Sequence, residues 1–163
     1  SSALTFDFRG HGASEGEVDD IEGMLNDVRA AIAFAQEHRY RQIMLVGAGM
    51  GGAIAIVAAA EYPEVTVVGF SVPSDFDVFT PLQVASEVRD RISVVASSDD
   101  LSAAYALRQF RDEAGIDAEH AVEYPGGAHG VDMLSGRAGA DVRAHFDRLL
   151  SSFWKPASQA VAR

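Results

Sequence analysis

Residues 43–60 read IMLVGAGMGGAIAIVAAA and carry no charged side chain over 18 positions. The apolar run before the glycines predicts a buried strand over 43–46, and the alanine-rich run over 53–61 predicts a helix that ends before Pro63. A strand, a glycine turn and a helix in this order are typical of a parallel α/β unit. A transmembrane helix is the competing interpretation, but four glycines in six residues would weaken a helix, and the rest of the chain needs this stretch as a buried strand and helix.

The rest of the chain repeats this alternation of strand and helix. The other expected strands are residues 3–8, 65–70, 92–96 and 118–124, and the other expected helices are residues 19–38, 81–88, 102–114 and 141–154. The pattern predicts an α/β fold, a mostly parallel sheet of about five strands with helices on both faces. We expect a single domain over residues 1–155 and a flexible tail over residues 156–163.

Composition excludes several classes of partner and chemistry. Thirteen Lys and Arg against 24 Asp and Glu give the 163-residue chain a formal net charge of -11, which disfavours nucleic acids and anionic membrane surfaces as partners. The chain has no cysteine, which rules out disulfides, a cysteine zinc site and a thiol nucleophile. No signal peptide and no metal-ligand spacing are visible, so we expect a cytoplasmic protein without a metal or cofactor.

The glycine turn has two chemical interpretations. The spacing Gly47-x-Gly49-x-x-Gly52 matches the dinucleotide-binding pattern, which needs an acidic residue at the end of the next strand. That strand instead ends in Phe-Ser-Val-Pro at residues 70–73. The stretch from Gly47 to Gly51 also fits the G-x-S-x-G nucleophile elbow, with Gly49 in place of the serine. Neither pattern is specific enough to decide alone.

Four segments together favour the second interpretation. They are residues 7–14 (DFRGHGAS), 46–52 (VGAGMGG), 95–100 (VASSDD) and 125–130 (PGGAHG). In this order they resemble four motifs of the α/β-hydrolase family, in particular its capless esterase-like and dienelactone-hydrolase-like members. These motifs are the D-x-R-G-x-G-x-S loop, the elbow, the turn that presents the acid and the loop that presents the histidine. The resemblance implies a partial α/β-hydrolase fold.

The resemblance also implies a role for individual residues. Gly49 stands at the nucleophile position, and the backbone N–H of Met50 would donate to an oxyanion. Asp100 stands at the position of the acid, with Asp99 as the second candidate, and His129 stands at the position of the base. In family members the histidine takes the proton of the nucleophile, and the acid holds the imidazole in the required tautomer.

The sequence departs from the family in two ways. Gly49 has no side chain that can attack, and the likeness begins at the family's fourth strand, so the loop that gives the second oxyanion donor has no counterpart. We therefore expect a protein of serine ester hydrolase lineage, inactive or weakly active, that binds a small acyl or ester-type ligand. The alternatives are a non-catalytic binding protein of hydrolase fold and a dinucleotide-binding domain. An incomplete sheet with open edges also predicts self-association.

Other polar residues are given lesser roles. Serines at the ends of strands lie on the same rim as the elbow, and one of them is expected to donate a hydrogen bond to a ligand; they are Ser71, Ser97 and Ser98. His11 is expected to be structural. The remaining histidines are expected at the surface or on helix faces; they are His38, His120 and His145.

Overall fold

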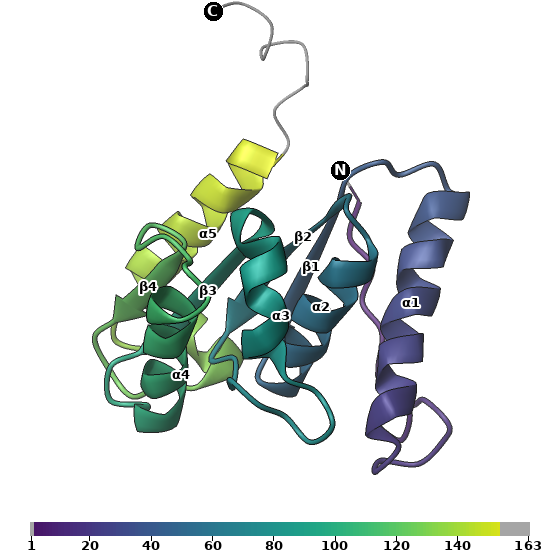
Figure 1. Ribbon diagram of the computed structural model, residues 1–163, viewed down its shortest axis with the longest axis horizontal. Helices are drawn as coiled ribbons and strands as arrows, with labels where there is room; N and C mark the ends of the chain where they lie inside the picture. Colours follow the sequence, from purple (N-terminus) through teal and green to yellow (C-terminus); the bar gives the residue numbers. More distant parts are fainter. Residues whose placement is uncertain (1, 154–163) are drawn as a thin grey trace, which may run out of the picture.

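Each strand of the sheet pairs in parallel with the next strand along the chain, in the order β1-β2-β3-β4. The computed structural model describes residues 2–153 (Figure 1). Its strands are β1 (Ile43–Ala48), β2 (Val65–Phe70), β3 (Ile92–Ser97) and β4 (Ala121–Tyr124). Its helices are α1 (Ile21–Glu37), α2 (Met50–Glu61), α3 (Pro81–Val88), α4 (Leu101–Asp112) and α5 (Gly139–Phe153), with short 3-10 helices η1 (Arg89–Arg91) and η2 (Gly130–Leu134). The predicted α/β class with a parallel sheet is confirmed.

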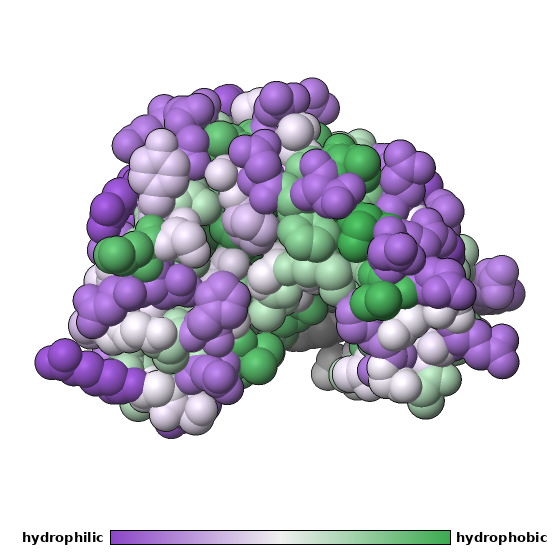
Figure 2. All heavy atoms as spheres, turned by 90° about the horizontal axis from the view of Figure 1, so that it is seen from below, coloured by the Kyte–Doolittle hydropathy of each residue, from purple (hydrophilic) through white to green (hydrophobic). Residues whose placement is uncertain are grey.

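Parallel pairing brings the carboxyl ends of the strands to one edge of the sheet. Gly47 of β1 lies opposite Gly69 of β2, and Ser97 of β3 lies opposite Tyr124 of β4. The loops that follow these strands therefore meet at this edge, which is the lower edge in Figure 1 and faces the viewer in Figure 2. The surface seen there mixes polar side chains with apolar patches, and a notch opens in its lower part.

Helices cover both faces of the sheet, as predicted, but unequally. One face packs against α2, α3 and α4, with α1 outside α2, and this side contributes most of the core. Its strand residues are almost fully buried; they include Val65, Val67, Ile92 and Val94. The other face packs against η2 and α5 in a smaller cluster around Phe70 and Met133. Each buried Val, Ile or Phe side chain contributes about 1.5–3 kcal/mol, so the larger cluster dominates the stability of the fold.

The strand expected over residues 3–8 does not form. This segment stays outside the sheet, and Leu4 and Phe6 are 55% and 43% exposed. A strand is stabilised by hydrogen bonds to a neighbouring strand, and β1 forms none with this segment. The segment packs instead through Phe8 against the larger core cluster, and residues 4–16 and α1 together line an open surface pocket of about 640 Å³. The outer edge of β1 consequently has no strand partner among residues 2–153.

The other elements follow the sequence prediction with bounds that differ by a few residues. Residues 43–60 form β1 and α2, so the transmembrane interpretation of this stretch is wrong. Among the described residues, no helix combines the length and apolarity needed to cross a bilayer. The end of the helix expected over 141–154 and the tail expected over 156–163 lie outside the described residues.

His145 lies on a helix, one of the two positions expected for it, but on the buried side of α5 rather than at the surface. His145 is only 7% exposed, and its Nδ1 lies 2.7 Å from the hydroxyl of Tyr124 on β4. Burial lowers the pKa of His145, and the nearby charges of Arg148 and His120 lower it further. The same desolvation raises the pKa of Tyr124. A histidine on a charged helix looks exposed in sequence, but here its helix position faces β4.

The buried His145 predicts a pH dependence of stability. The unfolded chain binds a proton at His145 at the ordinary pKa of 6.5, whereas the folded chain does so only at lower pH. Stability is therefore complete above pH 6.5 and falls as the pH drops toward the folded pKa, by at most about 1.4 kcal/mol per pH unit for one proton. His145→Gln keeps a hydrogen-bond acceptor for Tyr124 but does not titrate. In urea titrations, the unfolding free energy of this variant should therefore depend less on pH between pH 6.5 and about pH 5, a range in which carboxyl groups with ordinary pKa values stay ionised. An unchanged slope in this variant would contradict the assignment.

The open edge of β1 predicts that the protein self-associates. Val46, in the middle of β1, is 52% exposed, and exposed apolar edge strands pair with other chains. Light scattering behind size-exclusion chromatography should show dimers or larger species that grow with concentration, and Val46→Lys should reduce them. Val78→Lys is the matched control, because Val78 is similarly exposed at 55% but lies in a loop. A monomer at every concentration would refute the prediction.

Candidate active site

The corner between β1 and α2 consists of a single residue. β1 ends at Ala48 and α2 begins at Met50, so Gly49 alone reverses the chain, with φ +49° and ψ -118°. This is a backbone conformation that side-chain-bearing residues rarely adopt. The Gly49 N–H donates to the carbonyl of Phe70 at 2.9 Å, and the Gly49 carbonyl accepts from the N–H of Ala53 at 3.0 Å. The corner is thereby attached both to the neighbouring strand β2 and to its own helix.

The glycines around this corner differ in what a side chain would meet. A Cβ at Gly47 would lie 2.4 Å from the backbone of Gly51, and one at Gly52 would lie 2.6 Å from the Val72 side chain, so both permit close packing of strand, helix and loop. A Cβ at Gly49 meets only one atom within 4 Å, the Nε2 of His129 at 3.8 Å. A side chain at position 49 would therefore lie beside the imidazole, which the nucleophile-elbow interpretation requires and the dinucleotide interpretation does not.

Asp100 forms a hydrogen-bonded pair with His129. The Oδ2 of Asp100 lies 2.6 Å from the Nδ1 of His129, which comes from the loop after β4. Asp100 stands at the N-cap of α4, but its carboxylate makes no capping bond and accepts from the histidine instead. We assign the proton to Nδ1 from this bond, which leaves the lone pair of Nε2 on the side of Gly49. His129 is 63% exposed and Asp100 only 12%, so the base is accessible while the acid is largely covered.

The structure shows which of the two candidate acids bonds to His129. The Oδ1 of Asp99 accepts from the hydroxyl of Ser98 at 3.1 Å and has no bond to the imidazole. The backbone N–H of Asp99 donates to Gly126 in the loop that precedes the histidine. Of the residues that the sequence singled out, Gly49, Asp100 and His129 are brought together, and Asp99 supports the loop.

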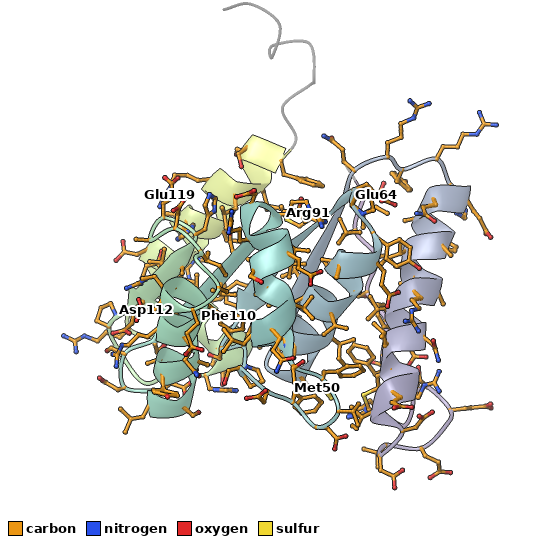
Figure 3. All side chains as sticks on the ribbon, in the orientation of Figure 1. Met50, Glu64, Arg91, Phe110, Asp112 and Glu119 are labelled. Atoms are coloured by element: carbon orange, nitrogen blue, oxygen red, sulfur yellow. The ribbon has the colours of Figure 1, made fainter. Side chains whose placement is uncertain are left out.

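The start of α2 supplies backbone donors beside the Gly49 corner. Met50 is the first residue of α2, and the N–H groups of a first helical turn have no partner within the helix. They also carry the positive end of the helix dipole, which favours negative charge. Figure 3 shows Met50 at the lower edge of the molecule, where the strands end. A carbonyl oxygen above Gly49 that develops negative charge would find a donor there.

Residues 7–14 form a loop that is fastened to α1 by Arg9. The guanidinium donates to Asp27 at 2.7 Å and to Asp20 at 2.5 Å, and both bonds lower the pKa of these carboxyl groups and raise that of Arg9. His11, expected to be structural, places its Nδ1 2.9 Å from the carbonyl of Arg9. Phe8, at the start of this loop, lies 3.7 Å from the position of a Cβ at Gly51. The loop therefore borders the first turn of α2.

Two of the strand-end serines have a role that the sequence does not reveal. Ser71 and Ser97 are 2% and 3% exposed, and both hydroxyls bond to the loop that carries His129. Both hydroxyls therefore have partners within the protein, and the expectation that one of the three strand-end serines donates to a ligand stays a prediction. Their partners are 59 and 31 residues away, so no local sequence signal identifies these bonds. Within residues 2–153, no group of three or more His, Asp or Glu side chains is placed to hold a metal ion.

Comparison with known families supports the resemblance to α/β-hydrolases in part. The family model described as "Serine aminopeptidase, S33" matches residues 2–74, which include the Gly49 corner but neither Asp100 nor His129. Together with the parallel sheet flanked by helices, the match supports a chain of partial α/β-hydrolase fold. It does not support a capless esterase or dienelactone hydrolase in particular. No match was found among curated proteins or among solved structures.

The conformation of Gly49 predicts that a side chain there costs stability. Gly49→Ala has room for its Cβ but must adopt a positive φ, so we expect a loss of about 1–3 kcal/mol of unfolding free energy in urea titrations. Gly51→Ala is the control, because its Cβ would make only an ordinary contact with Phe8 and the residue lies in α2. This control should be neutral or slightly stabilising. Equal stability of Gly49→Ala and the unmodified chain would contradict the strained corner.

Proposed function

We propose that this chain of partial α/β-hydrolase fold carries the acid and the base of a serine ester hydrolase site whose nucleophile position is Gly49. The observation that supports the proposal is the placement of His129 between its two partners. Its Nδ1 lies 2.6 Å from Asp100, and its Nε2 lies 3.8 Å from the position that a Cβ at Gly49 would take. This is the order of acid, base and attacking group that acyl transfer requires.

The chemistry open to the site is general-base hydrolysis. Without a side chain at Gly49 no acyl-enzyme forms, and water takes the place of the attacking hydroxyl. Nε2 of His129 removes a proton from the water as its oxygen attacks the ester carbonyl, and the backbone N–H of Met50 donates to the developing oxyanion. The imidazolium then returns the proton to the leaving alkoxide. General-base assistance contributes roughly 10²–10⁴-fold, so the chain is a weak esterase.

The ligand class that suits this site is a small, accessible acyl compound. His129 is 63% exposed, so the base is reached directly from solvent. Esters suit the site better than amides, because an alkoxide leaves more readily than an amine, which must be protonated first. The matching family is one of serine aminopeptidases, so an aminoacyl p-nitroanilide is the probe for the amide alternative.

A non-catalytic binding protein of hydrolase fold is the second candidate function. Gly49 supports it, because the residue that would attack is absent while the surrounding corner is intact. The open edge of β1 supports it as well, since unpaired strands bind other chains. The dinucleotide-binding alternative is weaker, because Gly47 and Gly52 are explained by close packing and β2 is followed by Ser71, whose hydroxyl is bonded to Gly130.

Replacing Gly49 with serine tests the proposal directly. With p-nitrophenyl acetate, the unmodified chain should show slow turnover that His129→Gln abolishes. Gly49→Ser should raise the rate by about 10²-fold and form an acyl adduct detectable by mass spectrometry, because a hydroxyl next to Nε2 has a base and an acid in place. Labelling by a fluorophosphonate probe should appear in the same variant.

Gly51→Ser is the matched control for this experiment. It introduces a serine two residues later in α2, where its side chain meets Phe8 rather than His129, and it should remain unreactive. An acyl adduct on the unmodified chain would show a nucleophile that the proposal lacks. Absence of any gain in a folded Gly49→Ser variant would leave the binding-protein function as the better account.

A further inference from the structure

Two buried serines form hydrogen bonds with the backbone on either side of His129. The hydroxyl of Ser97, the last residue of β3, donates to the carbonyl of Ala128 at 2.6 Å. The hydroxyl of Ser71, directly after β2, accepts from the N–H of Gly130 at 2.9 Å. The residues before and after the histidine are thus each fixed at the carboxyl end of a different strand, β3 and β2.

Ser71 is held in a single orientation by its other contacts. Its hydroxyl donates to the sulfur of Met133 at 3.7 Å, which leaves the oxygen lone pairs for Gly130. Its backbone has φ +50°, which is unusual for a residue other than glycine, and its N–H donates to the carbonyl of Val95 at 2.8 Å. The strained conformation directs the side chain toward the loop after β4.

The same corner of β2 also holds the nucleophile position. The carbonyl of Phe70 accepts from the N–H of Gly49, and the next residue, Ser71, accepts from the N–H of Gly130. Two consecutive residues therefore connect the elbow and the histidine loop through hydrogen bonds. The relative position of Gly49 and His129 depends on this connection, since the two belong to loops that are distant in sequence.

We infer that Ser71 and Ser97 are positioning residues that keep His129 in line between Asp100 and Gly49. The inference rests on the proposed function for its chemical meaning, but its structural claim stands on its own. The His129 side chain is 63% exposed, and within residues 2–153 its hydrogen-bond partner is Asp100 alone, so packing does not fix its direction. Without the bonds from Ser71 and Ser97, the loop that carries His129 moves, and the imidazole loses its hydrogen bond to Asp100. The imidazole proton then moves from Nδ1 to Nε2, which is the tautomer that a free histidine side chain prefers. Nε2 then has no lone pair for a hydroxyl or water above Gly49.

The experiment reads the tautomer of His129 from its imidazole ¹⁵N shifts in the otherwise unmodified chain. Ser97→Ala and Ser71→Ala should each move His129 from the Nδ1–H form toward the Nε2–H form. Ser97→Thr keeps the hydroxyl and suits a strand, so it should retain the original tautomer. Ser93→Ala is the matched control, because Ser93 is a buried serine of β3 whose hydroxyl lies 2.9 Å from the Nδ1 of His120. It should change the His120 signals and leave those of His129 alone.

A kinetic measurement separates this inference from the proposed function. In the Gly49→Ser background, Ser97→Ala should lower kcat for p-nitrophenyl acetate by about tenfold with little change in KM, and Ser97→Thr should restore it. If the tautomer changes but Gly49→Ser is inactive, the positioning role stands and the proposed function fails. If both alanine variants keep the Nδ1–H form, the positioning role is overturned. Should Ser71→Ala not fold, the three Ser97 forms decide the outcome.

Discussion

The single-residue corner at Gly49 is the constraint on which the site depends. Because β1 and α2 are separated by one residue, the first turn of α2 lies directly at the end of β1, and Gly47 and Gly52 provide the close approach that this needs. A residue with a side chain would be strained at this φ, at a cost of about 1–3 kcal/mol, whereas glycine adopts it freely. The corner thus rests on a backbone conformation that glycine adopts without strain.

The general architecture was predictable because parallel strands buried on both faces leave continuous apolar runs in the sequence. The strand expected over residues 3–8 did not form, because apolar residues in a segment say nothing about whether a neighbouring strand is there to pair with it. The burial of His145 was not predictable for a related reason, since only its contact with Tyr124 of β4 shows that this helix position faces inward. Periodicity reports the preferences of a segment, and these two features depend on its neighbours.

The site was predictable to the extent that its residues lie in recognisable loops. The order of the four motifs placed Gly49, Asp100 and His129 at one edge of the sheet, and the structure brings them together there. The sequence left Asp99 open as the acid, because adjacent carboxylates in one turn differ only in direction. The contribution of Ser71 and Ser97 was not predictable, since it consists of hydrogen bonds across 59 and 31 residues to a loop whose path the sequence does not define.

The geometry of the Asp100–His129 pair does not depend on a side chain at position 49. A Cβ at position 49 would have only Nε2 of His129 within 4 Å, so a Cβ there would add little packing. The histidine loop, by contrast, is anchored to the ends of β2 and β3 by buried hydroxyls, and its release would leave polar groups unsatisfied at about 1–3 kcal/mol each. Folding therefore preserves the acid–base pair whether or not position 49 carries a hydroxyl. A chain with Gly49 at the corner therefore holds an ordered Asp100–His129 pair beside it without a side chain at that position.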